Sequence, residues 1–329
     1  MSQLPVEIRP FSGQDYNALA DLSNAVYPEY RVTAEELRED DEFFDREGKY
    51  LRRRYVAVDL RTGELVGYAS VSHMPFAFHP QKFQMGLMVH SERRKQGIGS
   101  KLYERLANDL QELNAVSVKA WVLEDRTEAI TFLQRRGFNE VFRSWELRLD
   151  VRDCDLQAFL STVERVASQG ISITTLKAEL QAYPECLPKL YELQRLISQD
   201  IPAPDQITFV SYEEFVEHMK HSEFLPDAYF IAKDGDRYIG ISNLWRSRGE
   251  PEKLYQGVTG VLREYRRRGI ATALKVKTIE YARNHSYRFI VTQNASVNAE
   301  MLALNEKLGF KRSVGIITME RKIATCAKG

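Results

Sequence analysis

One pattern of residues occurs twice in this chain, at a constant spacing of 172 positions. The spacing holds from the end of an apolar stretch to a Gly-Phe pair about 50 residues later. Identical residues at this spacing include Val89 and Val261, Arg94 and Arg266, Gly97 and Gly269, Gly137 and Gly309, and Phe138 and Phe310. Upstream the register shifts by one, so that Gly67 matches Gly240, and loops tolerate such insertions. We interpret the chain as a duplication of one structural unit.

The repeat divides the 329 residues into two halves. Two domains are also expected from the length, because a single hydrophobic core rarely serves more than about 250–300 residues. We predict an N-terminal domain over residues 1–150 and a C-terminal domain over residues 171–329. Apolar residues at helical spacing over 155–167 predict a connector helix within residues 151–170.

The charge balance excludes a net basic field over the whole protein, so any binding of anions must be local. Lys plus Arg and Asp plus Glu number 46 each, so neither nucleic acid nor a membrane is an expected partner. Cys154, Cys186 and Cys326 are far apart without metal-ligand spacing, which argues against a zinc site or a disulfide scaffold. No stretch approaches the roughly 18 apolar residues of a membrane span. We expect a cytoplasmic protein that is a monomer or a homodimer.

Apolar residues alternate or recur at helical spacing in the same order in each half. In the first half, strands are predicted at 6–9, 55–59, 65–71, 84–89, 116–122 and 138–149, and helices at 12–26, 33–44, 97–113 and 126–135. In the second half, strands are predicted at 171–175, 229–233, 238–245, 255–261, 287–292 and 313–320, and helices at 184–199, 212–221, 270–282 and 298–308. The pattern is typical of an α/β fold.

The most informative stretch of each half is a glycine-bearing turn between a strand and a helix. One copy reads Arg266-Arg267-Arg268-Gly269-Ile270-Ala271 and the other Arg94-Lys95-Gln96-Gly97-Ile98-Gly99. A helix start leaves backbone N–H groups unpaired, and a glycine there admits a phosphate group without a side chain in the way. We call residues 94–100 the N-terminal cradle and residues 266–272 the C-terminal cradle, and predict that each binds a pyrophosphate.

Two common nucleotide motifs do not fit these turns. Gly-x-Gly-x-x-Gly, which is typical of dinucleotide sites, is missing, and so is the Gly-Lys-Ser/Thr of a P-loop. The pattern Arg-x-x-Gly-x-Gly/Ala after an apolar strand, with Gly-Phe about forty residues later, instead resembles the GNAT (GCN5-related N-acetyltransferase) superfamily. Two such halves in one chain resemble its tandem members, such as mycothiol-synthase-like proteins.

The resemblance implies two tandem GNAT-type domains, each a mixed, mostly antiparallel twisted sheet flanked by helices. It also implies acetyl-CoA as cosubstrate, no metal, pyrophosphate on the cradle N–H groups and the pantetheine arm along the preceding strand. The implied contacts in the C-terminal half are Thr259, Gly260, Val261, Arg266, Arg267, Arg268, Gly269, Ile270, Ala271, Thr272 and Asn298. Those in the N-terminal half are Leu87, Met88, Val89, Arg94, Lys95, Gln96, Gly97, Ile98, Gly99 and Ser100.

The same resemblance implies catalytic groups. A backbone N–H at Val261 would polarise the thioester carbonyl. In the family, the helix after the fifth strand begins with an Asn that contacts CoA and carries a Tyr that protonates the leaving thiolate. The C-terminal half has Asn298 and Asn305 at these two positions, whereas the N-terminal half has Arg126 and Leu133. Because leucine cannot donate a proton, we expect the C-terminal half to be the better acetyl-CoA site, with Asn305 in the position of the acid.

The resemblance implies a carboxylate as general base on the strand before each cradle. This chain departs from that pattern, because the strand has Gln84 and Met85 in one half and Tyr255 and Gln256 in the other. Candidates elsewhere are Asp200, His73, Glu36 and Asp40, although such residues more often cap helices or face solvent. Aromatic residues that either line an acceptor pocket or pack in a core are Tyr27, Tyr30 and Phe209.

The function expected from these features is acetyl-CoA-dependent N-acetylation. An amine of a small molecule or peptide would attack the thioester directly, without a protein nucleophile or a metal. The missing Tyr and the unassigned base leave a second hypothesis, a non-catalytic acyl-CoA-binding module.

Overall fold

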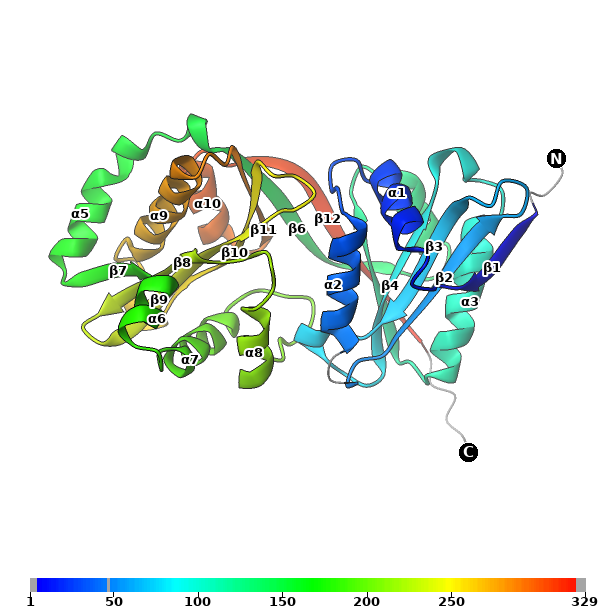
Figure 1. The fold of residues 1–329 in the computed structure, drawn as a ribbon, viewed down its shortest axis with the longest axis horizontal. Coiled ribbons are helices and arrows are strands. Elements are labelled where there is room, and N and C mark those ends of the chain that lie inside the picture. The colour runs from blue at the N-terminus through cyan, green and yellow to red at the C-terminus, as the bar shows by residue number, and fades with distance from the viewer. Residues whose placement is uncertain (1–4, 46–47, 324–329) are drawn as a thin grey trace. The chain divides into compact units, whose positions relative to one another are not determined.

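The computed structural model describes residues 5–45 and 48–323 of the chain (Figure 1). The chain forms two compact units. Unit 1 comprises Met1–Val141 and Ile317–Gly329, and unit 2 comprises Phe142–Ile316.

Unit 1 has the elements predicted over residues 6–135 in the predicted order, whereas the strand predicted at 138–149 belongs to unit 2 from Phe142 onward. Its strands are β1 (Val6–Pro10), β2 (Arg52–Asp59), β3 (Leu65–Ser72), β4 (Lys82–Val89), β5 (Ser117–Leu123) and the end of β12 (Lys311–Lys322). Its helices are α1 (Tyr16–Val26), α2 (Ala34–Asp45), α3 (Ile98–Glu112) and α4 (Thr127–Gln134). The sheet order is β1-β2-β3-β4-β5-β12, with antiparallel pairs from β1 to β4 and a parallel β4–β5 pair.

Unit 2 repeats this arrangement. Its strands are β6 (Asn139–Asp150), β7 (Ile171–Thr175), β8 (Phe224–Asp234), β9 (Arg237–Arg246), β10 (Lys253–Val261) and β11 (Phe289–Ala295). Its helices are α5 (Leu160–Ser168), α6 (Leu176–Ala182), α7 (Leu187–Ser198), α8 (Tyr212–His218), α9 (Ile270–Asn284) and α10 (Ala299–Lys307). The sheet order is β7-β8-β9-β10-β11-β6, and β10–β11 is the parallel pair. The mixed, mostly antiparallel sheet predicted for each half is confirmed.

Each unit takes its sixth strand from the other half of the sequence. β6 follows α4 along the chain but pairs with β11 from Ser144↔Ala295 to Asp150↔Phe289. β12 follows α10, yet its residues from Ile317 onward belong to unit 1 beside β5. The compact units therefore do not follow the linear division of the chain at residues 150 and 171. The alternation of side chains in β6 and in β12 allows each strand to complete either of the two sheets.

Side-chain caps explain several helix starts. Thr33 and Glu36 form a capping box at the start of α2: Thr33 Oγ1 accepts from the Glu36 N–H (3.1 Å), and the Glu36 carboxylate accepts from the Thr33 N–H (2.6 Å). Ser211 and Glu214 form the same box at α8. α6 was not predicted, because seven residues are too few for a clear helical period.

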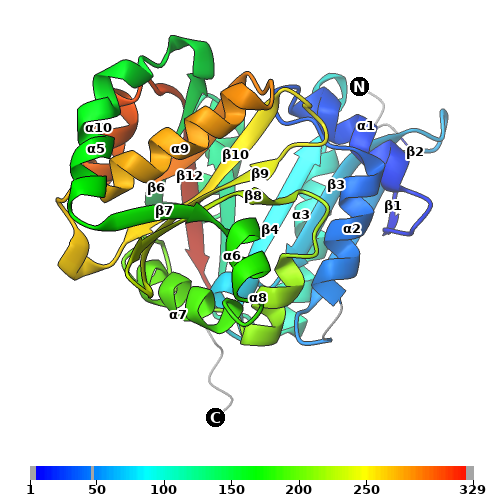
Figure 2. The ribbon, with the colours of Figure 1, turned by 60° about the vertical axis from the view of Figure 1, so that its left-hand side comes forward.

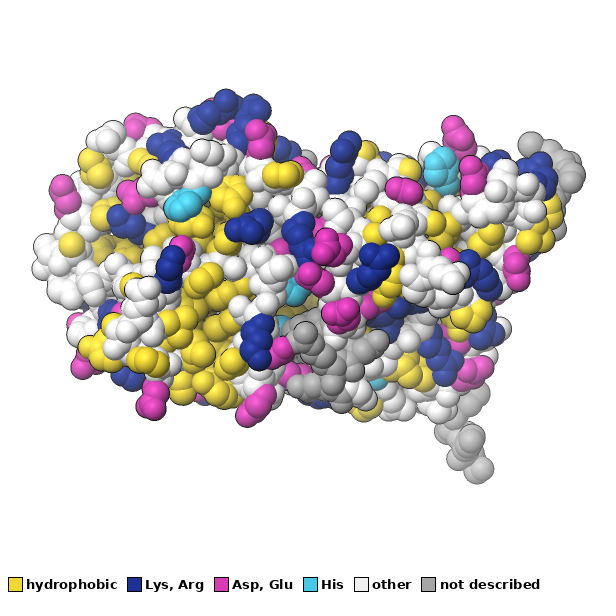
Figure 3. All heavy atoms as spheres, in the orientation of Figure 1, with side chains coloured by type: hydrophobic (Ala, Val, Ile, Leu, Met, Phe, Trp, Pro, Cys, Tyr) yellow, Lys and Arg dark blue, Asp and Glu magenta, His cyan; other side chains and the backbone are white. Residues whose placement is uncertain are grey.

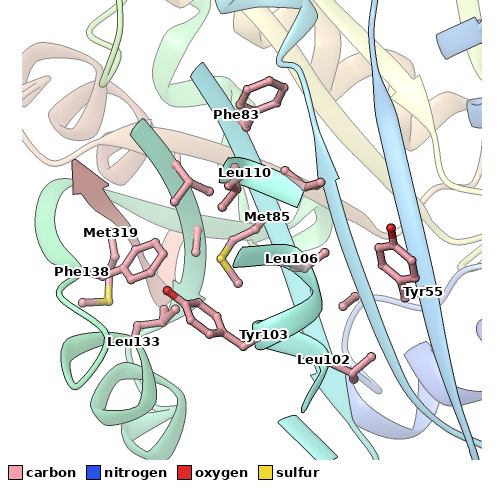
Figure 4. Packing of buried hydrophobic residues seen from close by; sticks show 14 of the residues in the cluster. Tyr55, Phe83, Met85, Leu102, Tyr103, Leu106, Leu110, Leu133, Phe138 and Met319 are labelled. Carbon is pink, nitrogen blue, oxygen red and sulfur yellow. The ribbon is translucent and has the colours of Figure 1, made fainter. Parts of the chain in front are cut away.

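Both β12 and β6 contribute to hydrophobic cores. Ile317 and Met319 are buried among the residues of α3, β4 and β5 in unit 1, where Met319 lies against Phe138 (Figure 4). In unit 2, Leu147 and Leu149 of β6 are fully buried. Exchanged strands are thus part of each core.

Helices cover both faces of the unit 2 sheet, with α9 on one face of β8–β10 and α7 on the other (Figure 2). Basic and acidic side chains are interspersed on the face drawn in Figure 3. Of the helices in the described ranges, none is long and apolar enough to cross a membrane.

Candidate functional site

The two cradles have the same backbone conformation. Gly97 and Gly269 precede the first residues of α3 and α9 with φ of 83° and 89°, a region that favours glycine. Two residues earlier, Lys95 and Arg267 also have positive φ, 59° and 60°. A left-handed non-glycine residue is uncommon, and its occurrence twice at equivalent positions shows that both turns have one specific shape.

After its first arginine, each cradle has backbone N–H groups without a backbone acceptor among the described residues. No backbone carbonyl of the described residues accepts from the N–H groups of residues 95–100 or 267–272. Ile98 and Ile270 are buried and anchor the two helix starts in their cores. Unpaired N–H groups at the positive end of a helix form a site for an anion such as a pyrophosphate.

The first arginine of each cradle ties the turn to the preceding strand. Arg94 Nε donates to the carbonyl of Val89 (3.2 Å), and Arg266 Nε donates to that of Val261 (3.1 Å). The Leu262 N–H donates to Ile239 of β9 (2.9 Å). Because successive peptide groups of a strand point to opposite sides, the N–H of Val261 faces away from β9.

In each unit the two parallel strands separate halfway along their length. The β4–β5 register ends at Met85↔Ala120, although the strands continue to Val89 and Leu123. Likewise the β10–β11 register ends at Tyr255↔Val291. We call these openings the unit 1 gap and the unit 2 gap. Beyond these pairs, the β4 edge at Leu87, Met88 and Val89 and the β10 edge at Thr259, Gly260 and Val261 have no paired β5 or β11 residue among those described. An unpaired strand edge can pair with an extended ligand.

A β-bulge distinguishes the unit 2 gap. The β9–β10 register shifts between Gln256 and Thr259, whereas β3 and β4 pair without a shift. Such bulges redirect backbone and side chains and are frequent beside active sites. Gly257, within the bulge, is exposed, and a Cβ there would lie 2.7 Å from Asn243 Oδ1 and 2.9 Å from Trp245 Nε1. Asn243 Oδ1 is buried and has no hydrogen-bond partner among the described residues.

The surroundings of the two cradles differ. Gly97 is exposed, and a Cβ added there would meet no atom within 4 Å. A Cβ at Gly269 would lie 3.0 Å from the Thr162 methyl group of α5. Arg268 Nε also donates to Gln169 Oε1 (2.7 Å), just after α5. The connector helix therefore flanks the C-terminal cradle, while the N-terminal cradle is open on that side.

The candidate bases have structural roles. The Asp200 carboxylate accepts hydrogen bonds from Arg263 and Arg266. These bonds, mainly the one from Arg263, lower the pKa of Asp200 to about 2. His73 Nδ1 accepts from the Leu51 N–H (3.0 Å), its Nε2 lies 3.2 Å from the Pro80 carbonyl, and burial lowers the pKa of its ring. Glu36 is a helix cap, and Asp40 is exposed on α2.

The four residues at the positions of the family's Asn and Tyr, on or just before α4 and α10, also make structural contacts. Asn298, which the resemblance implies as a CoA contact, caps α10: its Oδ1 accepts from the Met301 N–H (3.2 Å). Asn305 is fully buried and donates from Nδ2 to Asn294 Oδ1 (2.6 Å). Arg126 pairs with Glu29 (2.8 Å), and Leu133 is part of the unit 1 core. None of these four side chains is a free acid.

The aromatic candidates divide between the two interpretations. Phe209 packs on Tyr191 with a centroid distance of 5.3 Å and belongs to a core. Tyr27 ends α1, where burial raises the pKa of its hydroxyl. Tyr30 follows in the loop before α2.

Sequence reasoning did not identify a buried polar network under the unit 2 gap. Lys275 of α9 is only 1% exposed, and its Nζ donates to Gln256 Oε1 (3.3 Å). Gln256 Nε2 in turn donates to the Asn243 carbonyl (2.6 Å), and Ser242 Oγ lies 2.9 Å from Thr259 Oγ1. The signal in the sequence is a lysine at a core-facing helical position, between Leu274 and Val276.

A model of the acetyltransferase (GNAT) family matches residues 17–138 and again 190–310. A mycothiol acetyltransferase of Amycolatopsis mediterranei is 25% identical over 264 residues, which cover 76% of this chain and 78% of that protein. An N-alpha-acetyltransferase 30 of Schizosaccharomyces pombe is 29% identical over 125 residues, 37% of this chain and 78% of that protein.

Two solved structures share the architecture over nearly the whole chain. A tandem GNAT protein from the clavulanic acid biosynthesis pathway has a TM-score of 0.74 at 20% identity, covering 96% of this chain and 98% of that one. A GCN5-related N-acetyltransferase from Sphaerobacter thermophilus has a TM-score of 0.71 at 18% identity, covering 96% and 95%. Both likenesses concern the fold.

Proposed function

Because the chain belongs to the GNAT family of acetyltransferases, with one family domain matched in each half, we propose that it transfers an acetyl group from acetyl-CoA to an amine. The acceptor is a small molecule or a peptide. Its neutral amine attacks the thioester carbonyl directly, so that no protein nucleophile or metal takes part.

The observation that carries this proposal is the continuity of each gap with its cradle. In unit 2, the N–H of Val261 faces away from β9 at the end of β10. The N–H groups of residues 267–272 come next along the chain, in the turn before α9 and at the start of that helix. A ligand with an extended amide arm and a pyrophosphate requires that sequence of donors: a strand edge and then a helix start. Acetyl-CoA has this chemistry.

We assign the transfer reaction to unit 2. The bulge in β10 is the feature that favours it, since it leaves the backbone around Gly257 exposed beside the gap. A backbone N–H directed at the thioester oxygen would stabilise the negative charge that develops there, a contribution of about 3 kcal/mol for one such donor. The open N-terminal cradle of unit 1 is the candidate for a second CoA site.

One observation favours a second candidate function. Asn305 is an amide in the position of the family acid, and Asp200 and His73 are committed to structural contacts. A chain without a proton donor or base would bind acyl-CoA without turning it over. In that case the protein is an acyl-CoA-binding module.

Release of free thiol from acetyl-CoA, measured with a panel of amines, separates the two functions. The panel contains amino acids, aminosugars, polyamines and peptides with free N-termini. The enzyme hypothesis predicts that at least one amine accelerates thiol release and carries an added acetyl group by mass spectrometry. If CoA raises the melting temperature but no amine accelerates release, the binding module is the better description.

A further inference from the structure

Lys275 is an amine buried without a counter-charge. Among the described residues no carboxylate forms an ion pair with it, and its Nζ contacts Gln256 Oε1 and lies 4.8 Å from the centroid of the Phe310 ring. Burying an ammonium group without a partner is costly, so lysine is rare in such positions unless it has a use. Burial lowers the pKa of Lys275 to about 7.

The position of this amine is defined by its partner. Gln256 is the first residue of β10 beyond the last β10–β11 pair, Tyr255↔Val291, and it opens the bulge. Its side chain is turned toward α9, where Thr278 Oγ1 also lies 3.5 Å from Gln256 Oε1. Lys275 therefore lies beneath the vertex at which the two strands separate, on the α9 face of the sheet.

No proton donor for the leaving thiolate has yet been identified at this vertex among the described residues. A pantetheine arm that runs from the C-terminal cradle along β10 would reach this vertex with its sulfur atom near Gln256. Because Val261 lies five residues further along β10, a backbone donor at the bulge, and not the Val261 N–H, would then face the thioester oxygen. Asn305 cannot supply a proton because an amide does not ionise in this range. An amine that titrates near neutral pH satisfies the requirement for a general acid.

We propose that Lys275 donates a proton to the thiolate that leaves when unit 2 transfers its acetyl group. The inference rests on the proposed function. The acceptor nitrogen forms a bond to the acetyl carbon, the carbon–sulfur bond breaks, and the sulfur takes its electron pair and a proton from the Lys275 ammonium group. The acceptor nitrogen loses one proton to water, and the Lys275 amine regains one from water, so that charge and atoms balance.

The equivalent position in unit 1 supports a functional origin for this placement. Tyr103 of α3 stands 172 residues before Lys275 and is likewise buried and able to donate a proton. Its hydroxyl, however, accepts from Arg321 Nη1 (2.5 Å). A different ionisable side chain thus occupies the same place in each unit.

The test compares Lys275→Met, which fills about the same volume without an ionisable group, with Lys277→Met, at a half-buried position of α9 where the lysine pairs with Glu280. The amine that gives the fastest thiol release in the panel is the acceptor. We expect Lys275→Met to bind CoA as the wild type does but to release thiol about 100-fold more slowly, the usual size of a general-acid effect. Lys277→Met should match the wild type.

A change of leaving group provides the readout that a structural role would not affect. With 4-nitrophenyl thioacetate as donor, the leaving thiolate needs no proton, and Lys275→Met should fall within about 3-fold of the wild type. Equal thiol release from acetyl-CoA by Lys275→Met and the wild type would overturn the inference, as would loss of CoA binding or an acetyl group found on Lys275. A wild type that is inactive with every amine would instead overturn the proposed function.

Discussion

The Nζ atom of Lys275 lies 3.3 Å from Oε1 of Gln256, beneath the point where β10 and β11 separate. This contact places a buried amine against the residue that opens the bulge. The same relationship has consequences for stability, because a buried lysine that titrates near neutral pH couples folding to protons.

The unfolding free energy of the wild type should rise between pH 7 and pH 9, and Lys275→Met should abolish this rise. The folded-state pKa of about 7 is below the ordinary value of 10.5, so between these pH values the unfolded chain binds more protons than the folded one. The unfolding free energy of the wild type should therefore increase from pH 7 to pH 9, by up to about 1.4 kcal/mol per pH unit relative to Lys275→Met. Below pH 7 the difference should become constant. Urea unfolding at pH 6, 7, 8 and 9 measures it, and parallel curves for the two proteins would contradict the buried amine.

The exchanged strand makes a separate prediction. Met319 of β12 is 1% exposed in the unit 1 core, so Met319→Ala should destabilise that unit by about 2–5 kcal/mol. Hydrogen exchange should then increase in β5, Ser117–Leu123. Met301→Ala on α10, at a half-buried position, is the control. If hydrogen exchange increased in β11 and not in β5, the end of β12 would belong to unit 2. The assignment of β12 to the unit 1 core would then be wrong.

Gly257 and Asn243 should behave as a coupled pair. A Cβ at position 257 would lie 2.7 Å from Asn243 Oδ1, so Gly257→Ala should displace the Asn243 amide or the bulge and lower stability by about 1–3 kcal/mol. In an Asn243→Ala background the same change should cost less, and the coupling measured by a double-mutant cycle should exceed about 0.5 kcal/mol. Strictly additive effects would show that the bulge does not depend on this contact.

Much of the local structure could be predicted from the sequence. The strand before each cradle, the helix after it and the capping box at Thr33 follow from short-range patterns. Gly97 and Gly269 indicate sites that admit a phosphate group, whereas their positive φ in both turns is a finding of the structure. These features depend on neighbours within one or two turns of the chain.

Long-range choices could not be predicted in the same way. The alternation of residues in β6 fits the edge of either sheet, so nothing in it indicates pairing with β11. The role of Asp200 depends on Arg263 and Arg266, more than 60 residues away. Lys275 was overlooked because a charged residue in a helix usually faces solvent, and only the packing of α9 shows that this one is buried.

Two matched substitutions at helix starts distinguish acetyl transfer by unit 2 from acetyl transfer by unit 1. Ala271→Glu and Gly99→Glu each place a carboxylate on the second residue of α9 or α3, where the backbone has ordinary helical φ. A negative charge there opposes a bound pyrophosphate. If unit 2 transfers the acetyl group, Ala271→Glu should slow amine-dependent thiol release from acetyl-CoA by about 100-fold or more, while Gly99→Glu should change it by less than about 3-fold. Full activity of Ala271→Glu, together with loss of activity in Gly99→Glu, would contradict the assignment to unit 2 and place the reaction in unit 1.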